Sequence, residues 1–283
     1  MPKAPLVTAF ALSIGLCTAH ADVAANKALV TFALDAVLAQ RDASAVDRTF
    51  SADYIQHNPM LPSGSAPIKR FLSKPVNPDA PARPANVVHR ILGEGDLVAT
   101  HATYYNFGPT PLVAFDVYRI ENGLIAEHWD NLTPLASTPN PSGRTQVDGA
   151  VVITDHDRTQ VNKAHVVEMV QRLFIDREAL KPTQFISPDT YLQHNPLAGD
   201  GLAGLRQLMD SLRAQGKTLA YDTLELVVAE GNFVLTAVAG RLGEQPTAFY
   251  DLWRLEDGLI VEHWDVIAPI STDSLPPNYP GKF

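Results

Sequence analysis

The sequence contains one cysteine, Cys17, among its 283 residues. A disulfide within the chain is therefore excluded, and core packing must hold the fold together. Runs of lysine and arginine are also missing, and the formal net charge is −9. Nucleic-acid binding requires a basic surface that displaces counterions. We therefore do not expect nucleic acid as a partner.

Long apolar runs are scarce as well. Residues 4–17 form an apolar stretch that is too short to span a membrane comfortably, so we expect no membrane association. The stretch follows Lys3 and precedes residues 19–21, Ala-His-Ala, a pattern typical of signal-peptide cleavage. We predict a signal peptide over residues 1–21, cleaved between Ala21 and Asp22, and a periplasmic or secreted protein. The alternative is a frayed apolar N-terminus.

Two short phrases occur twice in the chain. Residues 54–59, Tyr-Ile-Gln-His-Asn-Pro, return with one substitution at residues 191–196, and residues 127–130, Glu-His-Trp-Asp, return at residues 262–265. The spacings of 137 and 135 residues agree within a small gap. Both phrases place polar residues in apolar, strand-like stretches, where a fold that needed only a core would use Val, Ile or Leu. The sequence therefore predicts a unit that was duplicated together with its polar residues.

The chain divides into two similar halves. Each half begins with a helical pattern, at residues 26–42 or 162–178, and has a second short helix near residues 68–72 or 202–212. Four strands follow in each half, which indicates an α+β fold with an antiparallel meander. The predicted strands are 87–92, 97–105, 112–120 and 124–132, with counterparts at 224–229, 233–241, 247–255 and 259–267. The predicted domain boundaries are 22–135 and 155–274, with a linker at 136–154 and a loose tail at 275–283.

The last hairpin of the first half decides which polar residues meet. His128 and Asp130 point to the same face of their strand because side chains alternate along a strand. A three-residue loop ending at Gly123 places Asp116 opposite His128 and Ala114 opposite Asp130. A two-residue turn would instead place a different residue, Phe115, opposite Asp130. We expect the three-residue loop.

Titratable residues from separate segments then gather on one face of the sheet. Convergent polar groups in an otherwise apolar hollow are the usual form of a small-molecule site. The sequence therefore predicts a pocket for a small-molecule ligand or substrate. Its candidate catalytic residues are Asp116, His128 and Asp130, with His101 from a neighbouring strand and His57 from the segment after the first helices.

The second half repeats most of this set. It has Ala237 at the position of His101, so we expect the first half to hold the better candidate active pocket. The candidate substrate-binding residues are Tyr54, Gln56 and Tyr118 in the first half, and His194, Asp251, His263 and Asp265 in the second.

These motifs resemble a known family. The Tyr-x-Gln-His-Asn-Pro phrase, the Asp116-x-x-Arg119 strand, the glycine turn and Glu-His-Trp-Asp together are similar to SnoaL-like polyketide cyclases, in the nuclear transport factor two superfamily that includes ketosteroid isomerases. The resemblance covers nearly all of both halves. It implies two cones, each a curved antiparallel sheet wrapped around helices, packed as a pseudo-dimer within the chain.

The resemblance also implies a chemistry. Family members close or isomerise carbonyl compounds without a metal or other cofactor, which implies Asp130 as the acid/base and His128 as its partner. Burial in an apolar cavity raises the pKa of a carboxylate, which makes it a useful base. In this scheme His101 or His128 is the electrophilic partner, and His57 orients the substrate.

Other interpretations remain open at this stage. The same cavity could serve a non-catalytic small-molecule binding protein, or side chains could fill it in a plain interaction scaffold. A metal site could be built from His57, His101, His128 and Asp130, which are residue types that bind zinc or iron. The proline-rich loop at residues 73–84 is either a lid or a surface excursion.

Overall fold

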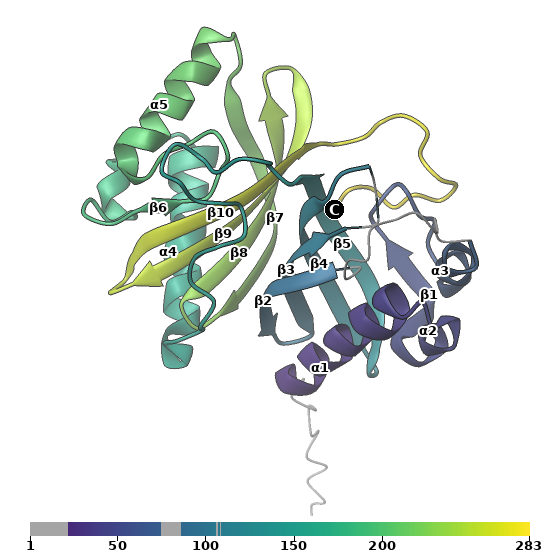
Figure 1. Cartoon of the computed structure of the whole chain (residues 1–283). Helices are drawn as coiled ribbons and strands as arrows, with labels where there is room; N and C mark the ends of the chain where they lie inside the picture. Colours follow the sequence, from purple (N-terminus) through teal and green to yellow (C-terminus); the bar gives the residue numbers. More distant parts are fainter. Residues whose placement is uncertain (1–21, 75–85, 106, 108) are drawn as a thin grey trace, which may run out of the picture.

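The computed structural model describes residues 22–74, 86–105, 107 and 109–283. The predicted signal peptide and most of the loop at 73–84 lie outside these residues. Each half has helices followed by a five-stranded sheet (Figure 1). The helices of the first half are α1 (Val23–Ala33), η1 (Leu34–Ala39), α2 (Ala43–Thr49) and α3 (Ser65–Leu72), and its strands are β1 (Phe50–Gln56), β2 (Asn86–Glu94), β3 (Leu97–Tyr104), β4 (Leu112–Glu121) and β5 (Leu124–Pro134).

The second half follows the same plan. Its helices are η2 (His156–Arg158), α4 (Thr159–Met169), η3 (Val170–Ile175), η4 (Pro182–Gln184) and α5 (Gly201–Ala214). Its strands are β6 (Leu192–Gln193), β7 (Leu219–Glu230), β8 (Phe233–Leu242), β9 (Gln245–Glu256) and β10 (Leu259–Pro269). The α+β class and the four long strands of each half are confirmed.

The two sheets have matching strand orders, β1-β5-β4-β3-β2 and β6-β10-β9-β8-β7. The four long strands of each sheet are antiparallel, as predicted. The first strand of each half, however, adds to the sheet edge in parallel with the last. The Tyr-x-Gln-His-Asn-Pro phrase therefore runs along the strand that carries Glu-His-Trp-Asp. This parallel edge strand was missed because its partner lies about 70 residues away, beyond any local pattern.

The predicted register of the β4–β5 hairpin is wrong. Asn122 and Gly123 both have positive φ angles, 51° and 75°, and form a two-residue turn that pairs Glu121 with Leu124. A bulge next to this turn then inserts one extra residue into β5. Asp116 consequently lies opposite Asp130, and His128 lies opposite Tyr118. The bulge still leaves the three titratable residues on one face.

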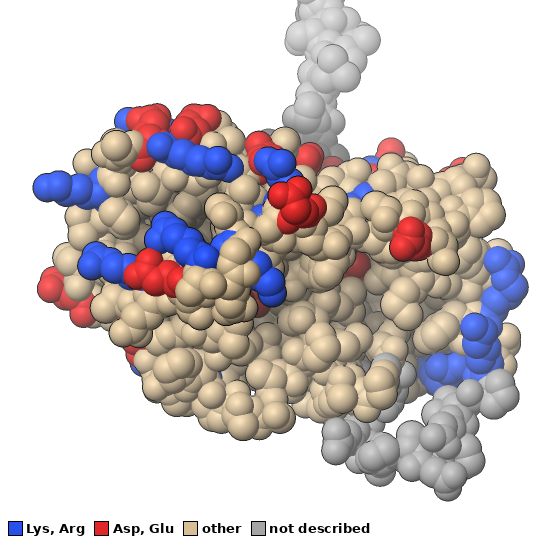
Figure 2. Space-filling view, turned by 90° about the horizontal axis from the view of Figure 1, so that it is seen from above, with Lys and Arg blue, Asp and Glu red and all other residues tan. Residues whose placement is uncertain are grey.

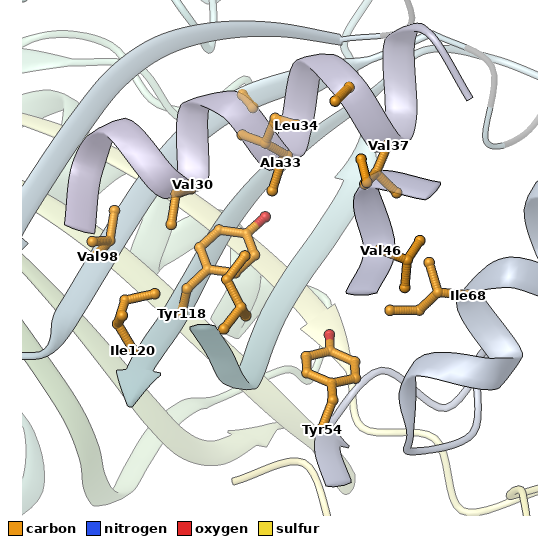
Figure 3. Packing of buried hydrophobic residues seen from close by; sticks show 14 of the residues in the cluster. Val30, Ala33, Leu34, Val37, Val46, Tyr54, Ile68, Val98, Tyr118 and Ile120 are labelled. Carbon is orange, nitrogen blue, oxygen red and sulfur yellow. The ribbon is translucent and has the colours of Figure 1, made fainter. Parts of the chain in front are cut away.

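The helices of each half cover one face of its sheet. Asp22 starts α1 by accepting a hydrogen bond from the Ala25 backbone N–H. Figure 3 shows the buried face of α1 and η1, with Val30 and Leu34, directed at strand residues such as Val98 and Tyr118. A second core of the same kind contains α4 and the concave face of the other sheet.

The opposite faces of the two sheets pack against each other. Phe115 and Trp129 of the first half share one buried cluster with Tyr250 and Trp264 of the second. Buried Asn131 crosses this layer, and its Nδ2 donates to the backbone oxygens of Ala248 and Val266 at 2.9 and 2.7 Å. Inter-sheet packing therefore includes fixed hydrogen bonds as well as apolar contact.

Two matching ion pairs flank the layer between the sheets. Lys27 contacts Glu230 and Lys163 contacts Glu94, both at 2.8 Å.

In the view from above, charged side chains lie mainly toward the two ends of the molecule, with a broad uncharged area between them (Figure 2). Among the described residues, no helix is long and apolar enough to cross a membrane.

Replacing Asn131 with alanine tests the inter-sheet hydrogen bonds. The Ala248 and Val266 carbonyls would lose their buried donor, so we expect the free energy of unfolding to fall by about 1–3 kcal/mol. Urea denaturation followed by tryptophan fluorescence measures this loss. The exposed control Thr218→Ala should change stability by less than about 0.5 kcal/mol. Equal effects of the two substitutions would contradict a specific role for Asn131.

Candidate active site

A cavity of about 300 Å³ lies between the helices and the concave sheet face of the first half. Its wall is largely apolar, with residues such as Val30, Leu34 and Phe71. Eight polar or aromatic hydroxyl-bearing side chains enter it near the sheet: Tyr54, Gln56, Asn58, Tyr104, Asp116, Tyr118, His128 and Asp130. The cavity therefore has most of its polar groups on the side formed by the sheet.

Asp116 and His128 form a buried pair in this wall. His128 Nε2 lies 3.0 Å from Asp116 Oδ1, and both side chains are almost inaccessible to solvent. The other carboxylate oxygen of Asp116 accepts hydrogen bonds from the hydroxyls of Tyr104 and Thr100 at 2.9 and 3.2 Å. Asp116 is therefore fully engaged in structural hydrogen bonds.

Gln56 determines the protonation of His128. The Asn58 backbone N–H donates to Gln56 Oε1, which identifies the acceptor end of this side-chain amide. The same oxygen lies 3.0 Å from His128 Nδ1, so Nδ1 must carry a proton. The opposite ring nitrogen, Nε2, faces a carboxylate, which also requires a proton between the two groups. His128 Nδ1 therefore donates to Gln56, and Nε2 shares a second proton with Asp116.

Asp130 is the less engaged carboxylate. Its Oδ2 accepts a hydrogen bond of 2.6 Å from Asn58 Nδ2. Within the described part of the chain, Oδ1 accepts no hydrogen bond, although Asp130 is only 4% exposed. Lys282 Nζ lies 3.8 Å from Oδ1. Oδ1 is therefore a buried acceptor that has no hydrogen-bond donor among the described residues.

Tyr54 supplies a hydroxyl donor on the same side. Its oxygen accepts a hydrogen bond of 2.9 Å from Gln56 Nε2, which leaves the hydroxyl proton free for a ligand. Burial, and then the charges of Asp130 and Asp116, raise the pKa of Tyr54 well above its ordinary value. Tyr54 therefore stays protonated at neutral pH and can donate a hydrogen bond.

A larger cavity, of about 610 Å³, occupies the same place in the second half. His263 Nε2 lies 3.0 Å from Asp251 Oδ1, and the Tyr221 hydroxyl donates to Asp251 Oδ2. Asn195 Nδ2 contacts both oxygens of Asp265, at 3.0 and 2.8 Å. Burial, and secondarily the charge of Asp251, raise the pKa of Asp265 to about 6. Both halves thus hold the same kind of hydrogen-bonded network. They differ in that Asn195 contacts both oxygens of Asp265, whereas Asn58 bonds one oxygen of Asp130.

His57 does not enter the cavity, so its prediction as a site residue is wrong. Its ring stacks on Trp129 on the opposite face of the sheet, with ring centres 4.9 Å apart. Nε2 contacts Glu127 at 2.9 Å, and Nδ1 donates to the Gly281 backbone oxygen at 2.8 Å. The alternation of β1 explains this: Gln56 points inward, and the next residue points outward.

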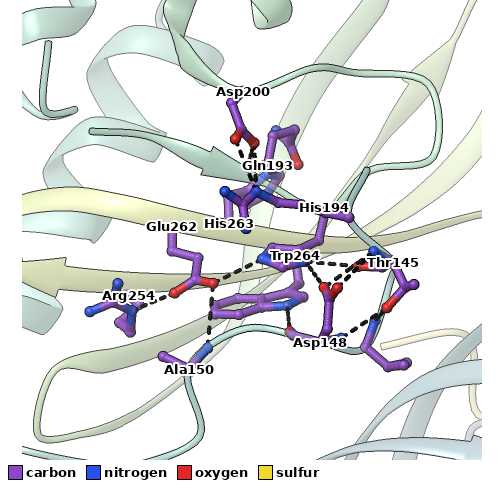
Figure 4. Close-up of polar contacts among 12 residues, drawn as sticks. Thr145, Asp148, Ala150, Gln193, His194, Asp200, Arg254, Glu262, His263 and Trp264 are labelled. Carbon is purple, nitrogen blue, oxygen red and sulfur yellow. Dashed lines mark hydrogen bonds and ion pairs between the residues drawn. The ribbon is translucent and has the colours of Figure 1, made fainter. Parts of the chain in front are cut away.

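His194 behaves in the same way in the second half. It stacks on Trp264 and contacts Glu262 and the Thr145 backbone oxygen, as the dashed lines in Figure 4 show. His194 is fully buried but lies outside the larger cavity. Its prediction as a substrate-binding residue is therefore also wrong.

His101 faces the layer between the sheets. It pairs with Phe115 across the β3–β4 ladder, whereas Thr100 pairs with Asp116 on the cavity side. Its Nδ1 accepts a hydrogen bond of 3.0 Å from Arg90 Nη1. Burial, with the Arg90 charge, holds the pKa of His101 well below its usual range. The predicted catalytic role of His101 is wrong, and its absence from the second half does not separate the two cavities.

The remaining predicted residues lie where the sequence analysis expected them. Tyr54, Gln56, Tyr118, Asp116, His128 and Asp130 line the first cavity, and Asp251, His263 and Asp265 line the second. Sequence analysis missed Asn58, whose side chain donates to Asp130, and Asn195, whose side chain donates to Asp265. Both belong to the repeated phrase, which was the available signal. Lys282 was missed as well, and no sequence pattern indicated it.

A metal centre fits this arrangement poorly. Asp116, His128 and Asp130 bring potential ligand atoms within 4.8 Å of one another, as do their counterparts in the second half. The two ring nitrogens of His128 are, however, already bonded to Gln56 and Asp116. A metal ion would have to displace these hydrogen bonds, so we describe the three residues as a hydrogen-bonded network.

Comparison with protein families bears on the first half. Residues 31–128 match the family described as the SnoaL-like domain. This segment is a SnoaL-like domain. The SnoaL-like domain spans the chain from within α1 to His128 and so includes the Asp116–His128 pair. No curated protein matches the chain by sequence.

Several solved structures are similar to part of the chain. TsrD from Streptomyces laurentii shares 24% identity over 39% of this chain and 90% of its own, with a TM-score of 0.32. An LEH-like epoxide hydrolase from M. tuberculosis shares 20% identity over 40% of this chain and 85% of its own, with a TM-score of 0.33. An NTF-2 like protein from Burkholderia xenovorans LB400 shares 20% identity over 41% of this chain and 88% of its own, with a TM-score of 0.34.

Asp265 should make stability depend on pH. Its pKa of about 6 in the folded protein exceeds the ordinary value of 3.8, so ionisation costs stability that protonation restores. Asp265→Asn cannot ionise, so its free energy of unfolding should rise relative to that of the wild type as the pH increases from about 4 to 7.5. We expect this difference to grow by up to about 3 kcal/mol. Urea denaturation across this range measures it. The exposed control Asp273→Asn should show no such trend, and a constant difference for Asp265→Asn would contradict the assignment.

Proposed function

We propose that this protein is an acid/base enzyme of the aldol cyclase or isomerase type, acting without a metal on a small hydrophobic carbonyl compound. One observation carries the proposal: Asp130, whose Oδ1 accepts no hydrogen bond among the described residues, lines the same apolar cavity as Tyr54, whose hydroxyl proton is uncommitted. A base and a hydrogen-bond donor on one wall suit proton removal beside a carbonyl group.

The reaction follows from these two groups. Asp130 Oδ1 removes a proton from the carbon next to the carbonyl, and the electron pair moves onto the carbonyl oxygen. Tyr54 donates a hydrogen bond to the developing enolate oxygen. In an isomerisation, Asp130 returns the proton to another carbon. In an aldol closure, the enolate carbon attacks a second carbonyl of the same molecule, and the resulting alkoxide takes the proton back from Asp130.

His128 and Asp116 support this reaction without exchanging protons with the substrate. Both ring nitrogens of His128 are engaged, by Gln56 and by Asp116. The ring lies in the same cavity wall as Asp130. Gln56 in turn holds both His128 and Tyr54, so one amide side chain orients the His128–Asp116 pair and the hydroxyl donor.

We propose that the second half is a further SnoaL-like domain and that the two domains form a pseudo-dimer within the chain. The matching sheet orders and the shared inter-sheet core support this pairing. The proposed boundaries stay at residues 22–135 and 155–274, joined by 136–154.

The second cavity favours a binding role over turnover. Asn195 contacts both oxygens of Asp265, whereas Asn58 bonds a single oxygen of Asp130. Asp265 has the raised pKa that suits a base, but because both its oxygens are engaged it offers a bound molecule no uncommitted acceptor. We therefore propose small-molecule binding without turnover as the function of the second cavity, and as the alternative function of the protein if the first cavity also lacks activity.

The probe 5-nitrobenzisoxazole tests the proposed base. A carboxylate in an apolar cavity removes its C–H proton and opens the ring to a coloured phenolate. We expect Asp130→Asn to lower kcat/KM by about 100-fold or more and Tyr54→Phe by about 10-fold. The matched variant Asp265→Asn should stay within about twofold of the wild type.

Two results would count against the proposal. Equal losses for Asp130→Asn and Asp265→Asn would remove the distinction between the cavities. Full probe binding with no turnover in the wild type, measured by isothermal calorimetry, would support the binding alternative instead.

We also propose export to the periplasm or beyond the cell, on the basis of the small-x-small pattern at residues 19–21. In an export-competent bacterial host, the recovered protein should begin at Asp22. Mass spectrometry of the intact protein measures this directly. Recovery of protein that retains residues 1–21 would contradict the proposal.

A further inference from the structure

Two segments cross from one half of the molecule to the site of the other. Strap one, defined as residues 140–150, follows β5 and reaches the second half. Strap two, defined as residues 276–283, follows β10 and returns to the first half, beside β5 (Figure 1). The predicted loose tail is therefore wrong for these residues, because strap two is anchored at several points.

Strap two docks behind the first cavity. The Tyr279 hydroxyl donates to the His57 backbone oxygen at 3.0 Å, and the Gly281 oxygen accepts the 2.8 Å bond from His57 Nδ1. Lys282 Nζ donates to the Asp130 backbone oxygen and lies 3.8 Å from Asp130 Oδ1. The Lys282 side chain is only 11% exposed.

Strap one docks in the same way behind the second cavity. Asn140 Nδ2 donates to the Gln193 backbone oxygen at 2.6 Å, and the Thr145 oxygen accepts a 2.8 Å bond from His194 Nδ1. Thr145 and Gly281 thus bind equivalent histidines, and they stand 136 residues apart, which is the spacing of the repeats. The residues that follow them, Gln146 and Lys282, are therefore counterparts.

The two straps therefore place different side chains at equivalent positions, and these side chains differ by one charge. Gln146 lines the second cavity and accepts a hydrogen bond from the Ala136 backbone N–H, so Asp265 has a neutral amide at the equivalent position. Asp130 instead has a buried ammonium. Burial lowers the pKa of Lys282, and the charges of Asp130 and then Asp116 act against this shift. The other titratable groups that face Asp130 are Asp116 from β4 and His128 from β5, which are paired with each other.

We propose that Lys282 is a positioning residue for Asp130, supplied to the first site by the second half of the chain: its bond to the Asp130 backbone oxygen fixes this residue in the cavity wall, and its ammonium group lies beside the carboxylate. The proposal rests on the proposed function, in which Asp130 is the base. It makes the first site dependent on strap two, and it identifies the pair Lys282 and Gln146 as the difference that gives Asp130, but not Asp265, a neighbouring ammonium group.

Charge and packing at this position can be separated by chemical rescue. We expect Lys282→Ala to lower kcat for 5-nitrobenzisoxazole by about 10-fold or more while KM stays within about twofold. Added n-butylamine, as its ammonium ion, should restore most of the lost kcat, whereas n-butanol should not. Lys181→Ala, which removes an exposed lysine that lines neither cavity, should leave kcat within about twofold. Unchanged activity of Lys282→Ala, or equal rescue by n-butanol, would overturn the proposal.

A second measurement does not depend on turnover. Infrared spectra of protein with ¹³C-labelled aspartate carboxyl groups resolve ionised from protonated carboxyls, and a difference spectrum against Asp130→Asn identifies the Asp130 band. We expect the Asp130 carboxyl band to move in Lys282→Ala, because the ammonium group 3.8 Å from Oδ1 is removed. Identical Asp130 bands would overturn the role of Lys282, whether or not the probe is turned over. A changed band without any turnover would uphold that role and contradict the proposed reaction alone.

Discussion

The burial of two carboxylates in one apolar cavity is the constraint on which the site depends. An isolated ionised carboxylate in such a place is costly, so each must gain a partner. Asp116 has an imidazole partner and two hydroxyl donors, whereas Asp130 has one amide donor and a nearby ammonium. This unequal division leaves Asp116 with both oxygens engaged and Asp130 Oδ1 without a hydrogen bond among the described residues.

The Gln56 side chain connects this division to the backbone. Because the Asn58 N–H donates to Gln56 Oε1 and so fixes the amide orientation, Oε1 also accepts a hydrogen bond from His128 and Nε2 donates to the Tyr54 hydroxyl. The tyrosine, glutamine and asparagine of the repeated phrase therefore face the cavity, while its histidine faces outward. The second half has the same arrangement, in which Gln193 contacts Tyr191 and His263.

Strand β5 serves both faces of the sheet. His128 and Asp130 project into the cavity, and Trp129 projects into the layer between the sheets, where His57 stacks on it. Since strap two binds His57 and Asp130 together, packing between the halves is mechanically linked to the position of the proposed base. The two halves therefore differ in the strap that packs against each of them, whereas the hydrogen-bonded networks inside the two cavities are alike.

The sequence by itself determined the two repeats, the four long strands of each half and the shared face of Asp116, His128 and Asp130, because helical and strand periodicities are local properties. Only the tertiary structure decided the bulge that sets Asp116 opposite Asp130, the parallel edge strand that turns His57 outward, and the packing of His101 against Arg90. It also decided the approach of Lys282 to Asp130, which joins residues about 150 positions apart. Such contacts follow from how complete sheets and straps pack, and no local pattern carries that information.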